Sequence, residues 1–192
     1  MSKKIGLALG GGGVRGFAHL GVVRALRQLG VDIHCIAGTS MGAIIGGVIA
    51  AGAEQNADRW VEAPDWKKLP SLFLELCFPW RSLIRGRKIE RFLRDTIPIG
   101  NFSDLKMPFA VVATDYNNGS QVVLQEGDVH TAIRASMSIP GVFEPIDIGG
   151  CVLVDGGLVN PVPIDVCRAL GADSVIAVDV NANRKRFVSR RI

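Results

Sequence analysis

Ser40 stands between two glycines in the run Gly38-Thr39-Ser40-Met41-Gly42, after a short apolar segment and before one rich in small residues. The glycines let the backbones of a strand and a following helix approach where a Cβ would clash. A serine on such a turn has its hydroxyl lifted out of the sheet edge, at a helix N-terminus whose partial positive charge favours a developing anion. The spacing predicts a nucleophilic serine. The alternative is a tight strand-to-helix turn whose serine only caps the helix.

Acyl transfer by a serine also needs donors for the negative charge that forms on the carbonyl oxygen. The run Gly10-Gly11-Gly12-Gly13 follows a predicted strand and precedes a predicted helix. Backbone amides in such a loop can point into one concavity with no side chains in the way. This glycine loop is therefore the expected oxyanion hole.

The histidines of this chain are badly placed to accept the serine proton. In α/β hydrolases the order along the chain is serine, acid, histidine, and no histidine follows His130. His19 falls on a predicted helix, His34 in a predicted strand and His130 near a helix start. We therefore expect structural roles for all three.

An aspartate can itself act as the base when it lies within hydrogen-bond reach of the hydroxyl and is partly desolvated, which raises its proton affinity. Asp155 is the best candidate, because it ends a predicted strand and is followed by Gly156 and Gly157, which allow close approach to another loop. Two alternatives stay open. Asp155 can be a turn residue that bonds nearby backbone, and Asp115 and Asp179 also lie at or near strand ends.

The glycine loop permits a competing hypothesis, because residues 11–16, Gly-Gly-Gly-Val-Arg-Gly, fit the dinucleotide fingerprint G-x-G-x-x-G. That fingerprint needs an acidic residue about 20 residues further on, at the end of the second strand, to hold the ribose. Here the second strand ends at Ala37 and runs into Gly38. Arg15 is also unexpected in a pyrophosphate turn. A dinucleotide-binding protein is therefore the less favoured alternative.

The elements that must position these residues alternate along the chain. We expect strands at 3–9, 32–37, 109–114, 121–124, 152–154 and 174–180. We expect helices at 17–29, 43–51, 53–63, 88–95, 129–137 and 164–170. Such alternation predicts an α/β fold with a mostly parallel sheet and active groups at the carboxyl ends of strands.

Three motifs, in this order, resemble the patatin-like phospholipase family: the glycine-rich run 11–16, the elbow 38–42 and Asp155-Gly156-Gly157. The run 132–141, Ala-Ile-Arg-Ala-Ser-Met-Ser-Ile-Pro-Gly, is similar to bacterial members, and the resemblance covers nearly all of residues 4–180. It implies a three-layer α/β/α sandwich with a mostly parallel central sheet. It also implies that Ser40 is the nucleophile and Asp155 its base in a Ser-Asp dyad. The motif residues around them are Arg15, Gly16, Gly38, Gly42, Gly156 and Gly157.

By this resemblance the chain is a serine esterase or lipid acyl hydrolase, of the phospholipase A or lysophospholipase type, working on a lipid or ester substrate without metal or cofactor. The chain departs from the family in two respects. Many members carry alanine where Gly157 stands, and similar bacterial proteins often continue well past the point where this chain stops. A non-catalytic regulatory or binding protein on the same fold is the second class of function that we consider.

A length of 192 residues, 48% of them hydrophobic, predicts one domain, at residues 5–182, and excludes a disordered chain. The stretch 64–87, which mixes aromatic, leucine and basic residues, is expected to form a cap or lid. The net charge of +4 is concentrated in a basic tail at 183–192. This run predicts either a solvated tail or a peripheral contact with an anionic membrane surface.

No nucleic-acid motif accompanies the basic tail, so we expect no nucleic-acid partner. The four cysteines show no metal-ligand spacing, and we expect no metal site. The N-terminal apolar run is too short for an export signal and is interpreted as the first strand. The predicted location is therefore the cytoplasm, with the tail offering a contact at the inner face of the membrane.

Overall fold

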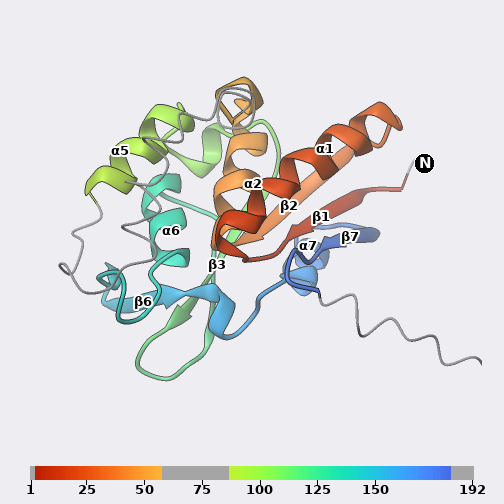
Figure 1. Cartoon of the computed structure of the whole chain (residues 1–192). Helices are drawn as coiled ribbons and strands as arrows, with labels where there is room; N and C mark the ends of the chain where they lie inside the picture. Colours follow the sequence, from red (N-terminus) through yellow and green to blue (C-terminus); the bar gives the residue numbers. More distant parts are fainter. Residues whose placement is uncertain (1–2, 58–86, 183–192) are drawn as a thin grey trace, which may run out of the picture.

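The computed structural model describes residues 3–57 and 87–182. The predicted lid at 64–87 therefore lies, apart from Arg87, outside the described residues, and so does the basic tail at 183–192. Of the helix expected at 53–63, residues 53–57 are described, and 54–57 of these are helical. The described residues form one central sheet covered by helices (Figure 1).

The sheet has seven strands: β1 (Ile5–Leu9), β2 (Ile33–Thr39), β3 (Phe109–Asp115), β4 (Gln121–Leu124), β5 (Ile146–Ile148), β6 (Cys151–Asp155) and β7 (Ser174–Val178). Their order is β5-β6-β3-β2-β1-β7, and β4 pairs with β3 off this path. Strands β3, β2, β1 and β7 are parallel. Strands β4 and β6 run antiparallel to β3, and β5 runs antiparallel to β6. The expected α/β fold is confirmed, with a mixed sheet whose parallel half carries Ser40.

Strand β5 is absent from the expectations drawn from sequence. It forms a hairpin with β6 through Gly149 and Gly150, both at positive φ (62° and 86°). At three residues, β5 is too short for alternation of apolar and polar residues to identify it.

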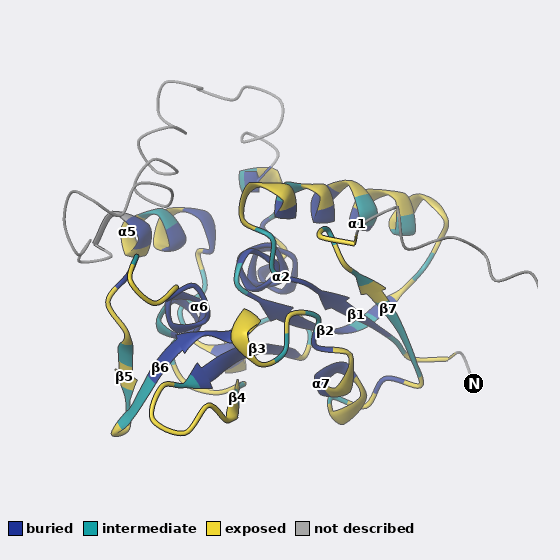
Figure 2. Cartoon of the chain, turned by 60° about the horizontal axis from the view of Figure 1, so that its bottom comes forward, coloured by how far each residue is buried: buried dark blue, intermediate teal, exposed yellow. Residues whose placement is uncertain are grey.

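The helices form two layers of unequal size (Figure 2). One face of the sheet is covered by α1 (Ala18–Gln28), α2 (Met41–Ala51), α5 (Arg87–Thr96) and α6 (Val129–Ser136), and the other by α7 (Ile164–Ala169). Short 3-10 helices occur at η1 (Gly13–Phe17), η2 (Phe102–Asp104) and η3 (Gly156–Leu158). The three-layer α/β/α sandwich is therefore confirmed.

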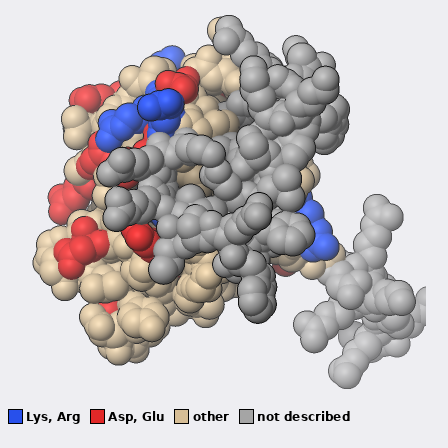
Figure 3. All heavy atoms as spheres, turned by 60° about the vertical axis from the view of Figure 1, so that its left-hand side comes forward, with Lys and Arg blue, Asp and Glu red and all other residues tan. Residues whose placement is uncertain are grey.

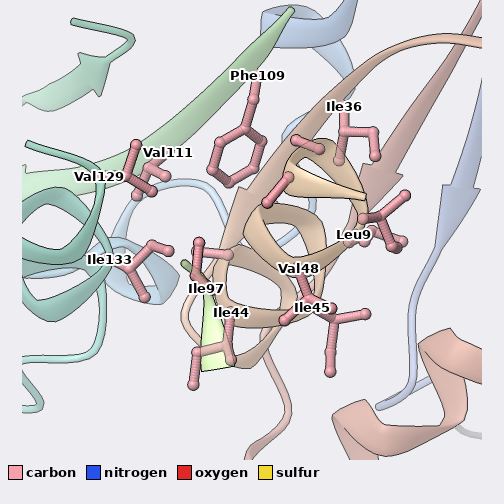
Figure 4. Close-up of a cluster of buried hydrophobic side chains, with 14 of the residues drawn as sticks. Leu9, Ile36, Ile44, Ile45, Val48, Ile97, Phe109, Val111, Val129 and Ile133 are labelled. Carbon is pink, nitrogen blue, oxygen red and sulfur yellow. The ribbon is translucent and has the colours of Figure 1, made fainter. Parts of the chain in front are cut away.

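Helix α2 is the centre of the larger layer, and all of its residues are buried. Its side chains Ile44, Ile45 and Val48 pack with Ile36 and Phe109, which come from the sheet (Figure 4). Alternate strand residues serve the other layer, since Cys35 and Ala37 belong to the cluster under α7. The helix that follows Ser40 is thus held on all sides. Within the described residues, no helix combines the length and apolar character needed to cross a bilayer.

Candidate active site

Ser40 occupies the turn between β2 and α2 with a strained backbone, at φ 54° and ψ −120°. Among the described residues it is the one non-glycine residue at positive φ, a conformation that costs about 1–3 kcal/mol and is typical of functional sites. Its backbone carbonyl accepts the first hydrogen bonds of α2, from Ala43 and Ile44. The hydroxyl therefore stands at the positive end of a buried helix.

The glycines around Ser40 are required by close backbone contacts. A Cβ at Gly38 would lie 2.5 Å from the Gly42 carbonyl oxygen and 2.7 Å from the Ala43 nitrogen. A Cβ at Gly42 would overlap the Leu9 carbonyl of the neighbouring strand. These contacts hold the sharp turn expected of a nucleophile elbow.

The hydroxyl of Ser40 donates a hydrogen bond to Asp155, with Oγ and Oδ2 2.8 Å apart. The other carboxylate oxygen, Oδ1, accepts from the Gly157 amide at 2.7 Å. Asp155 is only 8% exposed, and this burial raises the pKa of its carboxyl group above the ordinary value, although both hydrogen bonds act in the opposite direction. A carboxylate with raised proton affinity in contact with a hydroxyl can accept its proton directly.

The register of three strands explains this contact. Strand β3 extends beyond the end of β2, whose last residue Thr39 pairs with Val112. Strand β6 pairs antiparallel with this extension, so Asp155 comes to lie opposite Ala113, one residue beyond Val112. The expectation that active groups lie at the carboxyl ends of parallel strands holds for Ser40. Asp155 instead reaches the site at the end of an antiparallel strand that runs back toward the elbow.

The backbone of Asp155 is fixed on both sides. Its amide donates to the Ser138 carbonyl at 2.9 Å, and its own carbonyl accepts from the Thr114 hydroxyl at 2.8 Å. A Cβ at Gly156 would overlap the Val112 carbonyl, so glycine is needed there for close approach to β3. A Cβ at Gly157 would lie 2.8 Å from Asp155 Oδ1. Alanine at position 157 would therefore require the carboxylate to shift.

The glycine loop lies beside Ser40, but it does not offer four free amides. The Gly10 amide donates to the Val178 carbonyl and the Gly11 amide to the Pro161 carbonyl, each at 3.0 Å. The Gly10 bond continues the pairing of β1 with β7, and the Gly11 bond ties the loop to the segment before α7. Because both amides already have acceptors, we correct the expected set of oxyanion donors by removing Gly10 and Gly11. For Gly12 and Gly13, no acceptor of the backbone amide is found within the described residues. Gly13 has a φ of 54°, which explains glycine at this position.

Two further contacts fix the shape of this loop. The Asn181 side chain donates to the Gly11 carbonyl at 2.8 Å and accepts from Arg15 Nη1 at 3.0 Å. A Cβ at Gly16 would overlap the Met41 side chain, which brings η1 against the start of α2. Asn181 was not identified from the sequence. Its one sequence signal is a polar residue directly after the last strand, and such residues are too common to be informative.

Ser40 and Asp155 open into a pocket of about 300 Å³. Among the described residues, the rest of its lining consists of Gly11, Gly12, Gly13, Ile139, Pro140, Gly157, Leu158, Pro161 and Asn181. Leu158 is 62% exposed and Ile139 is 41% exposed at its rim. The volume is at the lower end of the range for ligand sites, so the pocket can hold an ester group and part of a chain.

The other titratable candidates have structural partners. His19 Nε2 shares a hydrogen bond with the Gly10 carbonyl, and His130 Nε2 with the Ile97 carbonyl, each at 2.8 Å. Both rings are buried, and burial lowers the pKa of His19. Asp115 accepts from Asn117 and Asn118 in a turn, and Asp179 accepts from the Asn181 amide. Each of these bonds goes to a group other than Ser40. No cluster of potential metal ligands occurs within residues 3–57 and 87–182.

A strained serine at a buried helix start, with a carboxylate against its hydroxyl, defines an α/β protein of the nucleophile-elbow class. Sequence comparison identifies the family. The family described as patatin-like phospholipase matches residues 7–168, and the chain belongs to this family. Membership of this family supports lipid hydrolase activity as a general class of function.

Individual relatives agree with this assignment. An uncharacterized NTE family protein of Mycobacterium tuberculosis is 40% identical over 182 residues, which cover 95% of this chain and 50% of the relative. Neuropathy target esterase sws of Drosophila melanogaster is 35% identical over 187 residues, which cover 94% of this chain and 13% of the relative. The chain thus spans half of the mycobacterial relative and a smaller share of the insect one. VipD from Legionella pneumophila shares the fold, with a TM-score of 0.57 at 14% identity, over 82% of this chain and 46% of that chain.

Proposed function

We propose that this chain is a serine esterase or lipid acyl hydrolase, of the phospholipase A or lysophospholipase type, that works with a Ser40–Asp155 dyad. The observation that carries the proposal is the 2.8 Å hydrogen bond from Ser40 Oγ to the buried Asp155 carboxylate. The name of the family and the word esterase in the name of the insect relative support the same class of reaction.

In the proposed reaction, Asp155 takes the hydroxyl proton while Ser40 Oγ attacks the ester carbonyl carbon. The resulting oxyanion is held by the amides of Gly12 and Gly13. Collapse of the tetrahedral intermediate breaks the ester bond, and Asp155 returns the proton to the leaving alcohol. A water molecule, deprotonated by the same carboxylate, then attacks the acyl-enzyme. Collapse of this second intermediate releases the carboxylic acid, and Asp155 returns the proton to Ser40 Oγ.

The pocket supports a substrate with an apolar chain next to its ester. Ile139, Pro140 and Leu158 line it beside Ser40, and they offer apolar contact without a charged group. Since the pocket volume is only about 300 Å³, a long acyl chain would extend along the exposed rim beyond it.

A peripheral contact with anionic lipid and a cytoplasmic location also remain proposals. The face in Figure 3 carries several acidic side chains beside a smaller group of basic ones. The tail at 183–192 carries five Arg and Lys residues, and because of this composition we propose that it is attracted to an anionic bilayer. Co-sedimentation with anionic and neutral vesicles, with and without the tail, tests this proposal.

The decisive experiment for the hydrolase combines turnover with covalent labelling. Wild-type protein should hydrolyse a chromogenic short-chain ester and react at Ser40 with a serine-directed phosphonate, as located by mass spectrometry. Ser40→Ala should do neither. An inactive, unlabelled wild-type protein would instead favour the regulatory or binding alternative, and saturable NAD binding would favour the dinucleotide hypothesis. A panel of phospholipids, lysophospholipids and simple esters then defines the substrate.

A further inference from the structure

The C-terminal end of α6 touches the backbones of both Ser40 and Asp155. The Ser136 hydroxyl, on the last residue of α6, accepts a hydrogen bond from the Ser40 amide at 2.8 Å. Two residues later, the Ser138 carbonyl accepts from the Asp155 amide at 2.9 Å. One short segment thus holds Ser40 after β2 and Asp155 at the end of β6, although β3 lies between these strands.

The Ser136 hydroxyl provides a hydrogen-bond acceptor for the Ser40 amide. Ser40 precedes the first turn of α2, so its amide has no acceptor inside that helix. Its positive φ is also the strained feature of the elbow. Ser136 is fully buried, so its hydroxyl supplies the acceptor that water supplies at an exposed turn. Loss of this acceptor would leave the Ser40 amide without a hydrogen bond. It would also remove a contact that holds Ser40 in its strained conformation.

The segment itself is rigidly held. The Ser138 hydroxyl donates to the Arg134 carbonyl at 2.9 Å and accepts from Arg134 Nη1 at 2.8 Å. The Arg134 guanidinium, only 2% exposed, lies 4.9 Å from the centre of the Phe143 ring. A segment fixed in this way can set the distance between two groups that it contacts.

We infer that Ser136 is a positioning residue for the reaction, which holds the Ser40 backbone in the orientation that directs Oγ at Asp155. This inference rests on the proposed hydrolase function. Ser136 acts on the nucleophile through the main chain, and the described lining of the pocket does not include it.

Two substitutions separate positioning from packing. Ser136→Ala removes the acceptor and leaves a small void. Ser136→Cys nearly preserves the side-chain volume but replaces the hydroxyl with a thiol, which is a weak acceptor. Thr96→Val is the matched control, because it removes another buried hydroxyl, at the end of α5, that does not line the described pocket.

We expect kcat for the chromogenic ester to fall about 10- to 100-fold in Ser136→Ala, with KM within about twofold, because small misplacements of a reacting group are costly. Ser136→Cys should stay folded at the assay temperature and still lose about tenfold or more in kcat. Thr96→Val should keep kcat. In nitrogen-15 spectra, the Ser40 amide should exchange with solvent about tenfold faster in Ser136→Ala than in wild type.

Wild-type kcat in either Ser136 variant, or unchanged exchange of the Ser40 amide, overturns the inference. If Ser136→Ala does not fold, Ser136→Cys decides alone: retained kcat contradicts positioning, and lost kcat in a folded variant supports it. A wild-type protein that neither hydrolyses esters nor reacts with the phosphonate contradicts the proposed function, and this inference falls with it. An active wild type with an equally active Ser136→Cys contradicts the inference only.

Discussion

Ser40 and Asp155, 115 positions apart in the chain, meet in a hydrogen bond of 2.8 Å because β6 turns back along the end of β3. The carboxylate faces the hydroxyl directly, and the two described buried histidines are bonded to backbone carbonyls elsewhere. This geometry requires Asp155 to take the proton itself if Ser40 acts as a nucleophile. The functional predictions about Asp155 follow from this contact.

Asp155→Asn should lower kcat for a chromogenic ester by about 10²- to 10⁴-fold, the usual contribution of a general base. The amide keeps the shape of the carboxyl group and can still accept from the Gly157 amide, so the fold should be retained. Steady-state kinetics measures the effect, and circular dichroism of the same preparation is its control. Asp115→Asn, in a turn outside the pocket, should keep wild-type activity. An Asp155→Asn variant of full activity would remove this residue from the mechanism.

The pH dependence of activity should follow the raised pKa of Asp155. Only the ionised carboxylate accepts a proton, so kcat/KM should rise with pH through that raised pKa, above the ordinary value of 3.8. An acid limb that follows the ordinary value instead would contradict desolvation as the main influence on Asp155.

The raised pKa of Asp155 also affects the stability of the fold. When the folded pKa of an acid exceeds the unfolded pKa, the folded state binds more protons between the two values, so the free energy of unfolding falls as pH rises through that window. The ionised Asp155 thus destabilises the fold at neutral pH. Asp155→Asn should be at least as stable as wild type at pH 7, and this advantage should shrink below pH 3.8. Urea unfolding at several pH values measures it; a less stable variant at pH 7 would count against the raised pKa.

Local signals in the sequence sufficed for the main elements. The glycines around Ser40 and the alternation of strands with helices predict the turn after β2 and the α/β class, because both depend on short-range sterics and apolar spacing. The pairing of Ser40 with Asp155 also came from the sequence, by elimination of the histidines and from the motifs. The lid expected at 64–87 stays a prediction, since it lies almost entirely outside the described residues.

Features set by long-range register could not be predicted. The direction of β6 depends on how far β3 extends past β2, which no local pattern encodes. The same holds for the amides of Gly10 and Gly11, whose acceptors, Val178 and Pro161, are distant in sequence. Ser136 and Asn181 matter through contacts across the fold, and a serine or an asparagine at a segment end carries no distinguishing signal by itself.

Gly42→Ala tests whether the elbow needs a bare backbone. The new Cβ would overlap the Leu9 carbonyl and lie 2.7 Å from the Gly10 carbonyl oxygen. Because these backbone atoms can move little to relieve the overlap, we expect the free energy of unfolding to fall by about 3 kcal/mol or more. Gly21→Ala is the control, because Gly21 is exposed on α1 and its Cβ would meet nothing within 4 Å. It should gain about 0.5–1 kcal/mol. Equal unfolding curves for the two variants would refute the packing argument.

Asn181→Ala tests whether the glycine loop must be held in place for the reaction. The side chain bonds to Gly11 and to Arg15, and its loss frees the loop that carries the Gly12 and Gly13 amides. Donors must be preorganised to stabilise an oxyanion, so we expect kcat/KM to fall about tenfold, equivalent to about 1.4 kcal/mol.

The matched control for this prediction is Asn118→Ala. Asn118 is also an exposed turn residue whose amide donates one hydrogen bond, to Asp115, and accepts one, from the Ser120 amide. Both variants should lose a similar stability of about 1 kcal/mol, measured by urea unfolding, because each loses two exposed hydrogen bonds. Only Asn181→Ala should lose activity, since Asn118 does not line the described pocket. If both variants keep wild-type kcat/KM, the loop is held by its backbone bonds alone and Asn181 has no part in positioning the donors.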